Sequence, residues 1–346
     1  TTTNFDGSYY FETRSKADSI AATFVGYNKQ VQRIKLNQYQ EINFKLSSAN
    51  VSLAEVVIVA GENPADIIMR KVIANKAKNS SQVLESIQYE AYNKIQLDAN
   101  NFDNKLKDRK LMKQFGFVFD YVDTSSVNGK TYLPVFISEV LSNVYVRNNP
   151  DGKIEDIVAA RGSGIENPSI VQFMGNLYQE VKIYDNYVQL LEKNFISPVA
   201  DFGFTFYRYY LVDSAYIDQN WCYKLMFKPR RKQELAFTGE LWIHDTTFAV
   251  KRVEFKVDES ANLNFVSDVT IIQDYSFINN QFWYLTSDYL VADFNFSENN
   301  KNLPGFFGQR TTTYRNFIVN EPKEAKFYRQ PVKVTMEEGS LDKTPE

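Results

Sequence analysis

A series of long segments in the second half of the chain, each alternating apolar or aromatic residues with polar ones, most constrains the fold. Alternation with a period of two is typical of a strand that buries one face. Turn-like polar residues separate the segments, and Asn279-Asn280 is the tightest connection, which favours a hairpin. The series therefore predicts one strongly curved antiparallel sheet. The predicted strands are Phe202–Val212, Trp221–Lys228, Phe237–His244, Ala249–Val257, Phe265–Phe277, Gln281–Phe294 and Arg310–Val319.

The residues before this series predict a mixture of strands and helices, so the fold class is mainly β with some α (α+β). Asn63 can cap a helix that has Pro64 at its first position and continues, with apolar residues at helical spacing, to about Asn79. The predicted strands here are Ala54–Ala60, residues 83–97, Leu133–Arg147 and Lys153–Gly162, and the further predicted helices are residues 100–122 and Ile165–Leu177.

Composition excludes several classes of function. The chain has 346 residues, 44% of them hydrophobic, and a net charge of −3, so it has no global positive field to attract nucleic acid. Cys222 is the one cysteine, which excludes an internal disulfide and a cysteine-cluster metal site. His244 is the one histidine, so a Ser-His-Asp or Cys-His arrangement would have to use it. No apolar run is long enough for a transmembrane helix.

The first 46 residues have strand periodicity that begins in mid-pattern, like the back half of a small β-sandwich. Asn4–Phe11 gives a turn and an aromatic strand, and Ile20–Tyr27 has the pattern Ile-x-x-x-Phe-x-Gly-Tyr. This segment resembles the carboxypeptidase-regulatory-like (peptidase-associated) domain, a prealbumin-like β-sandwich that precedes many outer-membrane proteins of Bacteroidetes-type bacteria. The segment Leu53–Asn79 resembles the junction in an uncharacterised subgroup of these proteins, and Leu133–Glu139 and Gly239–Ile243 fit its middle region.

This resemblance implies a periplasmic location at the outer membrane of a Gram-negative bacterium, next to a C-terminal barrel that is absent from this sequence. It implies four parts: a partial sandwich (1–50), a junction with a strand, a helix and a connecting segment (51–120), a curved antiparallel β domain (121–320) and a linker (321–346). It implies no peptidase activity, and a zinc peptidase would need more than one histidine.

The rhythm of Tyr121–Asn320 is also similar to half-barrel carriers of lipoproteins and lipids in the bacterial envelope. The segments that carry this similarity are Tyr223–Pro229, the strand Gly239–Ile243 followed by His244-Asp245, and Val250–Phe255. The similarity rests on the fold and assigns no residue a role.

Four short motifs were weighed as sites of chemistry. His244-Asp245 fits a turn better than a catalytic base, since no nucleophile is indicated nearby. Gly162-Ser163-Gly164 lacks the further glycines or lysine of a phosphate loop and favours a flexible connection. The carboxylates of Glu139, Glu155 and Asp156 fit solvated strand faces. The basic run Lys228–Lys232 fits a solvated loop, with contact to anionic lipid headgroups as a further option.

The aromatic strands support two interpretations. In one, their side chains form a core packed by the helix Ile165–Leu177; in the other, they line an apolar cavity that accepts an acyl chain or a partner segment. The candidate cavity residues are Phe204, Phe206, Trp221, Tyr223, Trp242 and Phe255. We expect no catalytic residue, metal or cofactor.

The leading hypothesis is a non-enzymatic interaction or scaffold module of the cell envelope, whose partner is another envelope protein or its own barrel. The alternative is a lipid or lipoprotein carrier, and a second alternative is a hydrolase that uses His244.

Overall fold

The computed structural model describes residues 8–10, 12, 18–23, 29–35, 38–47, 62–80, 83–100, 123–124, 131–164, 180–257, 266–294 and 305–345. The chain divides into two compact units, Thr1–Gly61 and Glu62–Glu346.

The first unit contains an antiparallel pair of short strands, β1 (Ser19–Ala22) and β2 (Gln30–Arg33). Tyr9 adds a long-range link, because its hydroxyl donates to the backbone oxygen of Ile42 at 2.6 Å and its ring lies 6.3 Å from that of Phe44. This hairpin agrees with a strand-rich segment, and the assignment to a peptidase-associated sandwich stays a prediction.

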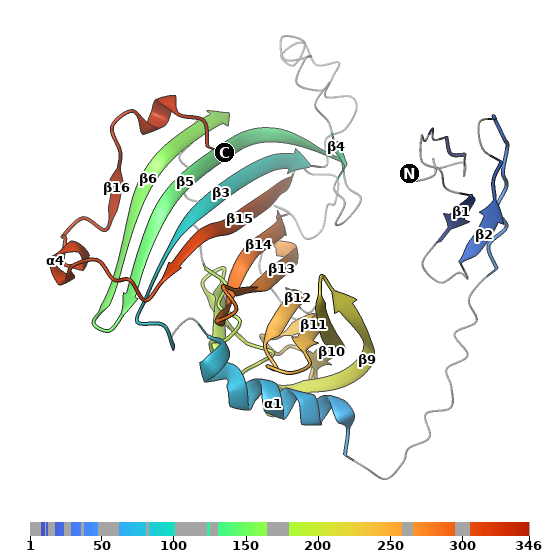
Figure 1. The fold of residues 1–346 in the computed structure, drawn as a ribbon, viewed down its shortest axis with the longest axis horizontal. Coiled ribbons are helices and arrows are strands. Elements are labelled where there is room, and N and C mark those ends of the chain that lie inside the picture. The colour runs from blue at the N-terminus through green and yellow to red at the C-terminus, as the bar shows by residue number, and fades with distance from the viewer. Residues whose placement is uncertain are drawn as a thin grey trace. The chain divides into compact units, whose positions relative to one another are not determined.

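The second unit is built on one large curved sheet (Figure 1), which confirms the predicted mainly β class. The strand order is β16-β6-β5-β3-β15-β14-β13-β12-β11-β10-β9, with β4 also paired to β5. All these pairs are antiparallel except β16 with β6. The strands are β3 (Ser86–Asn100), β4 (Asp123–Thr124), β5 (Thr131–Asn148), β6 (Asp151–Gly164), β9 (Tyr207–Ile217), β10 (Asn220–Pro229), β11 (Phe237–His244), β12 (Val250–Val257), β13 (Val266–Ile278), β14 (Phe282–Phe294), β15 (Gly305–Val319) and β16 (Val334–Met336).

Several strand connections follow the sequence closely. Asn279 and Asn280, between β13 and β14, have φ values of 50° and 55°, the left-handed conformation that a tight hairpin turn requires and that asparagine tolerates. The predicted hairpin is confirmed. The predicted pair Leu133–Arg147 and Lys153–Gly162 is also confirmed, as β5 and β6.

The predicted helix that follows Asn63 is confirmed as α1 (Pro64–Asn79). The Asn63 side chain accepts a hydrogen bond from the backbone nitrogen of Ala65 at 3.1 Å, as an N-cap residue does. The helix contacts both β9 and β14, two strands with four others between them. A single helix can touch both only if the sheet curves around it, so α1 lies on the concave side (Figure 1). We call the face that packs against α1 the inner face and the opposite one the outer face.

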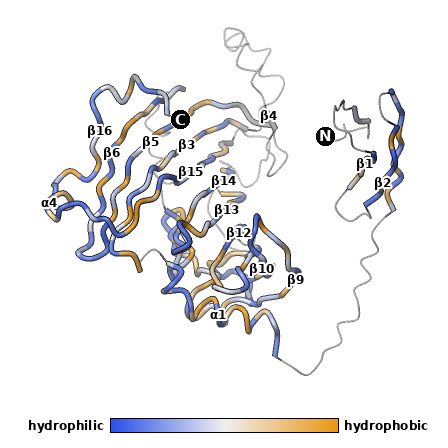
Figure 2. The backbone as a smooth tube through the Cα atoms, in the orientation of Figure 1, coloured by the Kyte–Doolittle hydropathy of each residue, from blue (hydrophilic) through white to orange (hydrophobic). Residues whose placement is uncertain are grey.

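The main core lies between the inner face of β9–β14, α1 and residues 180–206. That last segment contains the hairpin of β7 (Tyr187–Leu190) and β8 (Lys193–Ile196), and the one-turn helix α3 (Gly203–Phe206). Phe195 of β8 stacks on Phe237 of β11, with 5.0 Å between the ring centroids. Phe237 in turn makes an edge-to-face contact with Phe255 of β12, with 4.6 Å between the centroids. Figure 2 shows the alternation of apolar and polar residues along the strands that bury this face. Asn100, the first residue of the predicted helix at 100–122, ends β3. Residues 101–122, the predicted helix at 165–177 and the predicted strand Ala54–Ala60 lie outside the described residues.

The first predicted strand of the series starts later than its alternation suggests. Phe202 lies in a turn and Gly203–Phe206 forms α3, while the strand starts at Tyr207. A Cβ on Gly203 would lie 2.7 Å from the Tyr209 hydroxyl, so glycine permits this close fold-back. Tyr209 then donates to the backbone oxygen of Pro198 at 2.7 Å. The alternating phenylalanines therefore pack from a turn onto the core and form no strand.

Two predicted parts divide differently in the structure. Helix α1 and strand β3, predicted as a junction, belong to the unit that contains the sheet. The predicted linker packs against β6, with α4 (Ala325–Tyr328), β16 and a 3-10 turn at Ser340–Asp342. The ring of Phe327 in α4 makes an edge-to-face contact with that of Tyr145, with 5.1 Å between the centroids. Such aromatic contacts hold the segment against the sheet despite its high content of proline and charged residues.

Candidate ligand cavity on the inner face

A cavity of about 420 Å³ lies on the inner face, beyond the end of the main core. Its walls come from β3, β5, β6, β14, β15 and β16, with Glu180 from the segment before β7. The lining residues are Tyr89, Ala91, Asn93, Val140, Val144, Lys153, Glu155, Ile157, Glu180, Asp288, Arg310, Thr312, Tyr314 and Val334.

Strand register explains why these distant residues meet. Val140, Asn93 and Thr312 are cross-strand partners in one row across β5, β3 and β15. The next row along the strands contains Ala91 and its partner Tyr314. Partners in adjacent strands project to the same face, and every second residue of a strand does so. The cavity wall is therefore a direct product of the pairing of β5, β3 and β15.

One end of the cavity is aromatic. The Tyr89 ring lies 5.7 Å from that of Tyr284 and 5.5 Å from that of Tyr314, and Phe317 completes the group at 6.1 Å from Tyr89. Burial raises the pKa of all three tyrosines above the ordinary value, so their hydroxyls are neutral at physiological pH. This end offers apolar rings with uncharged hydroxyls.

The wall toward the main core contains a buried ion pair between Arg310 of β15 and Asp288 of β14. Burial raises the pKa of Asp288, and the guanidinium of Arg310 opposes that rise. Gln273 on β13 donates to Asp288 at 3.2 Å and to the backbone oxygen of Val181 at 2.7 Å, and it accepts from the Tyr275 hydroxyl at 2.9 Å. The network fixes both charged groups.

A second ion pair lies at the more exposed side of the cavity. Lys153 of β6 contacts Glu180 at 2.5 Å, and Lys182 lies 3.5 Å from the same carboxylate. Burial raises the pKa of Glu180, but the two lysines outweigh it, and the pKa lies below the ordinary value. Glu180 is therefore ionised at neutral pH and holds Lys153 at the edge of the cavity.

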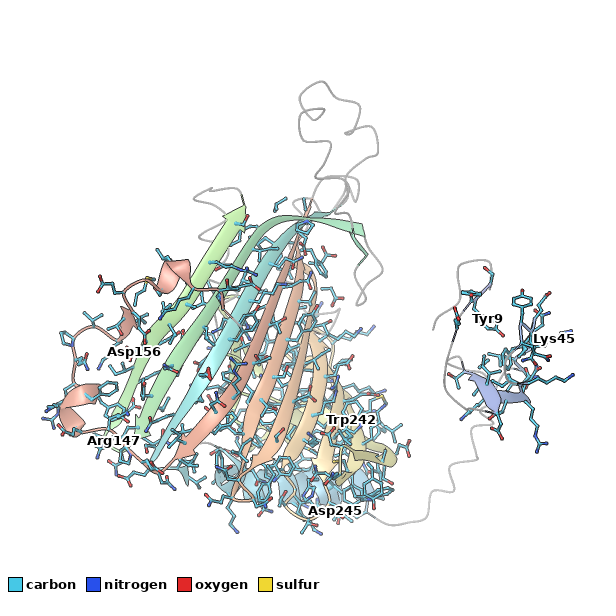
Figure 3. All side chains as sticks on the ribbon, turned by 45° about the horizontal axis from the view of Figure 1, so that its top comes forward. Tyr9, Lys45, Arg147, Asp156, Trp242 and Asp245 are labelled. Carbon is cyan, nitrogen blue, oxygen red and sulfur yellow. The ribbon has the colours of Figure 1, made fainter. Side chains whose placement is uncertain are left out.

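The six aromatic residues predicted to line a cavity lie elsewhere, and none of them lines this one. Phe255 is fully buried in the main core, and Phe204, Phe206 and Tyr223 pack against that core. The ring of Trp221 makes an edge-to-face contact with that of Tyr216, with 4.8 Å between the centroids. Trp242 lies on the outer face under the Lys224 ammonium group, 4.9 Å from it (Figure 3). The structure does not bring the six together, and a ligand at these residues stays a prediction.

His244 lies in the turn between β11 and β12, as expected. Its Nδ1 atom is 2.9 Å from the Thr247 hydroxyl, and its Nε2 atom is 3.8 Å from Asp245. The turn also anchors α1, because Asn79 donates to the backbone oxygen of Thr247 at 3.0 Å. Burial lowers the pKa of His244, and Asp245 opposes this. These contacts are local to the turn and separate from the residues that line the cavity.

Glu139, Glu155 and Asp156, the carboxylates considered as a possible catalytic pair, each have a different environment in the structure. Glu139 binds the Tyr92 hydroxyl and Arg161, each at 2.5 Å, and these contacts hold its pKa below the ordinary value. Glu155 lines the cavity, whereas Asp156, the next residue, binds Thr335. Glu155 and Asp156 point to opposite faces because they are consecutive in a strand.

The Gly162-Ser163-Gly164 motif, predicted as a flexible connection, instead ends β6. Its three residues pair with Phe136–Ser138 of β5. A Cβ on Gly164, whose φ is 136°, would lie 2.4 Å from the backbone oxygen of Val135, so this close strand contact requires glycine.

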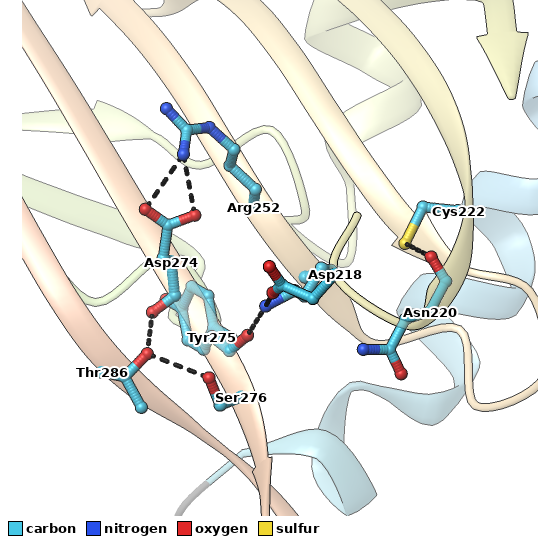
Figure 4. Close-up of polar contacts among 9 residues, drawn as sticks. Asp218, Asn220, Cys222, Arg252, Asp274, Tyr275, Ser276 and Thr286 are labelled. Atoms are coloured by element: carbon cyan, nitrogen blue, oxygen red, sulfur yellow. Dashed lines mark hydrogen bonds and ion pairs between the residues drawn. The ribbon is translucent and has the colours of Figure 1, made fainter. Parts of the chain in front are cut away.

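A buried lysine of β12, Lys251, lies near the turn between β9 and β10 that contains Asp218 (Figure 4). The ammonium group of Lys251 donates to the backbone oxygen of Tyr275 at 3.0 Å and contacts Asp218 at 2.8 Å. Cys222 lies nearby in the same view. Burial raises the pKa of the Cys222 thiol to about 11, so the thiol is protonated at neutral pH and is a poor nucleophile.

Among the described residues, no three His, Cys, Asp or Glu side chains gather in a way that could hold a metal ion. In the same part of the chain, no helix has the length and apolar character needed to cross a membrane.

The sequence does indicate the cavity residues, through charged and polar residues at inward-facing strand positions. On β14, Asp288 has the same parity as the buried Leu290 and Ala292, and on β15, Arg310 and Thr312 share the inner parity. Charged or polar residues at core positions of a strand are the informative exceptions to the rule that charges stay outside.

Solved structures similar to this chain have low sequence identity. A DUF1329 family protein from Desulfovibrio piger ATCC 29098 is 10% identical, with 77% of this chain and 98% of that chain covered and a TM-score of 0.32. A putative outer membrane lipoprotein-sorting protein domain from Vibrio parahaemolyticus is 9% identical, with 76% and 97% covered and a TM-score of 0.28. A LolA superfamily protein from Nitrosomonas europaea is 11% identical, with 76% and 96% covered and a TM-score of 0.24. At these TM-scores the similarities assign no function.

No curated protein matches the chain. A family model does match it, over residues 68–316, which include most of α1 and most of the sheet. The chain therefore belongs to the family of unknown function DUF5686.

Proposed function

We propose that this chain is a non-enzymatic carrier that binds the acyl chain of a lipid or lipoprotein in the inner-face cavity. The cavity of about 420 Å³ is the observation that carries the proposal. Small-molecule sites in proteins are usually concave, mostly apolar and about 300–1,000 Å³ in volume, with a few polar groups that orient the ligand.

The chemistry of the walls suits an amphiphilic ligand. Ala91, Val140, Val144 and Ile157 give an aliphatic surface, and the tyrosine group closes one end. An acyl chain gains free energy by leaving water for such a surface, at about 25 cal/mol per Å². Lys153 and Glu180, at the exposed side, are placed to meet a polar headgroup.

The non-enzymatic part of the proposal is supported by the states of Cys222, the one possible thiol nucleophile, and His244, the one possible histidine base. Cys222 is protonated at neutral pH, and His244 is engaged within its own turn. Neither residue lines the cavity. A reaction in the cavity would therefore need groups other than these two.

We place this function in the cell envelope, at the periplasmic face of the outer membrane. The resemblance of Thr1–Leu46 and Leu53–Asn79 to envelope proteins supports this location. The lipid would then be an envelope lipid or the acylated end of a lipoprotein.

An interaction module is the second candidate, and one observation favours it. The segment at the β16 edge exposes Val332, Val334 and Met336, which have relative exposures of 56%, 53% and 53%. An exposed apolar sheet edge is a ready site for an added strand of a partner protein. Met336→Lys should abolish partner capture if this edge is the interface and should leave lipid binding unchanged.

The carrier proposal is tested with a fluorescent fatty acid, dansyl-undecanoic acid, and with mass spectrometry of lipid extracted from the purified protein. Ala91→Trp fills the cavity from β3 and should weaken probe binding by about tenfold or more, which equals about 1.4 kcal/mol. Thr313→Trp places the same ring on the outer face of β15 and is the matched control, with binding as in the wild type.

Thermal unfolding of both variants separates lost binding from lost structure, since overpacking a core costs typically about 1–3 kcal/mol. Folded wild-type protein that neither retains a lipid nor binds the probe contradicts the carrier proposal. So does an Ala91→Trp variant that binds the probe as tightly as the wild type.

A further inference from the structure

The outer face of the sheet carries an unusual surface at its β9 end. We call it the basic rim and define it by Arg208 and Tyr210 of β9 with Lys224, Met226 and Lys228 of β10. Arg208 pairs with Lys228 and Tyr210 pairs with Met226 across the two strands, so these four side chains share one face. That face is the outer one, because the alternate residues Tyr207, Tyr209, Leu225 and Phe227 are buried in the main core.

Apolar side chains are exposed next to these cations. Met226 is 39% exposed, and Val212, at the register shift of the edge strand β9, is 54% exposed. These side chains do not contribute to the main core, because other residues of the same strands form the inner face. Large apolar side chains exposed together, with polar residues around them, mark interaction surfaces.

The positive charge of the rim is largely uncompensated. Lys224 contacts Glu240 at 2.9 Å, but the ion pairs of the described residues include none to Arg208, Lys228 or Lys232. Lys228 lies over the Tyr210 ring at 5.2 Å, which leaves its ammonium group on the surface. The following loop adds Arg231, whose side chain is 73% exposed and lies 3.7 Å from the carboxylate of Glu234. The chain has a net charge of −3, so this basic surface is local.

We infer that the basic rim docks the protein on a membrane that contains anionic lipids. Exposed apolar residues enter the headgroup region while lysines and arginines contact lipid phosphates, and each cation near such a surface contributes to binding. Tyr210 and the neighbouring Trp242 suit the same boundary, because aromatic rings with a polar edge favour membrane interfaces. The combination of apolar, aromatic and basic groups on one face favours a bilayer over an acidic protein, which would need the charges alone. This inference goes beyond the carrier function and does not depend on it.

The test is co-sedimentation of the full chain with vesicles of phosphatidylcholine alone and with vesicles of phosphatidylcholine mixed with phosphatidylglycerol. We expect binding to the anionic vesicles only, weakened by added salt through screening. The variant with Arg208→Glu and Lys228→Glu should bind about tenfold or more weakly. Met226→Ser removes the apolar side chain without changing the charge of the rim, and it should weaken binding through lost insertion.

The matched control reverses two exposed cations elsewhere, Lys326→Glu and Lys343→Glu, and gives the same change of net charge. It should bind as the wild type does. The inference is wrong if the wild type ignores anionic vesicles, or if the rim and control variants lose binding equally. Normal binding by Met226→Ser, with loss in the charge variant, overturns insertion and points to an acidic protein partner instead.

Discussion

The side chain of Asn63 joins the start of α1 to the edge strand β9. Its amide nitrogen donates to the backbone oxygen of Tyr209 at 3.0 Å, while its amide oxygen accepts from the backbone nitrogen of Ala65 at 3.1 Å. One residue therefore caps the helix and fixes it to the sheet that curves around it.

Asn63→Ala should lower the free energy of unfolding by about 1–2 kcal/mol, because it removes the cap and the link to β9 together. Urea denaturation followed by circular dichroism measures this. Asn75→Ala is the control, since Asn75 bonds only within the exposed side of the helix, to Lys71. Equal losses in the two variants would show that the link to β9 contributes nothing.

Arg310→Met should destabilise the fold by about 3–5 kcal/mol, because it leaves the buried carboxylate of Asp288 without its cation. The double variant, Arg310→Met with Asp288→Leu, should recover most of the loss since it removes both charges. Chemical denaturation of the two variants and the wild type gives the comparison. A double variant as unstable as the single one contradicts the pairing as the source of the effect.

The single histidine makes a pH measurement direct. His244 should titrate below its ordinary value of about 6.5, because burial disfavours its charged form. Proton NMR of the one imidazole measures the midpoint. In the window between that midpoint and about pH 6.5, the unfolded chain binds more protons than the folded one, so stability rises with pH.

Asp245→Asn should lower the midpoint of His244 further, since Asp245 is the group that raises it. A His244 midpoint at or above about 6.5 in the wild type would contradict the effect of partial burial on the ring.

Cys222 should not react with a thiol reagent at neutral pH while the protein is folded, and it should react fully in denaturant. The thiol is buried and its pKa is raised to about 11, so little thiolate exists. Absorbance of released thionitrobenzoate measures the reaction. Thr246→Cys places a second thiol at an exposed turn position and should react at once, and rapid reaction of Cys222 itself would be the contrary result.

The sequence predicted the sheet well where local rules dominate. Alternation located the strands from Trp221 onward to within a few residues, and the Asn279-Asn280 turn and the Asn63 cap had clear chemical signatures. It failed at Phe202–Phe206, where alternating aromatic residues pack from a turn, because alternation reports burial and not hydrogen bonding.

The candidate site was harder to predict than the fold. The cavity needs the pairing of β3 with β15 and with β5, and pairing between remote strands leaves no local signal. Aromatic content drew the prediction to Phe255 and Trp242, which the structure places in the core and on the outer face. Arg310 and Asp288 are charged residues at strand positions where the alternation predicts buried apolar side chains. The alternation alone does not indicate that the two pair with each other.

The pairing of β3 with β15 also governs how the chain reaches its fold. Gln88 is opposite Ile318, so two neighbouring central strands are separated by nearly the whole unit in sequence. During synthesis β3 emerges early and must wait for β15, with a long unpaired edge that other chains can join. Folds with such distant contacts form slowly. The partly made protein should therefore depend on chaperones that shield β3, and truncation before Gly305 should yield aggregates rather than a smaller folded sheet.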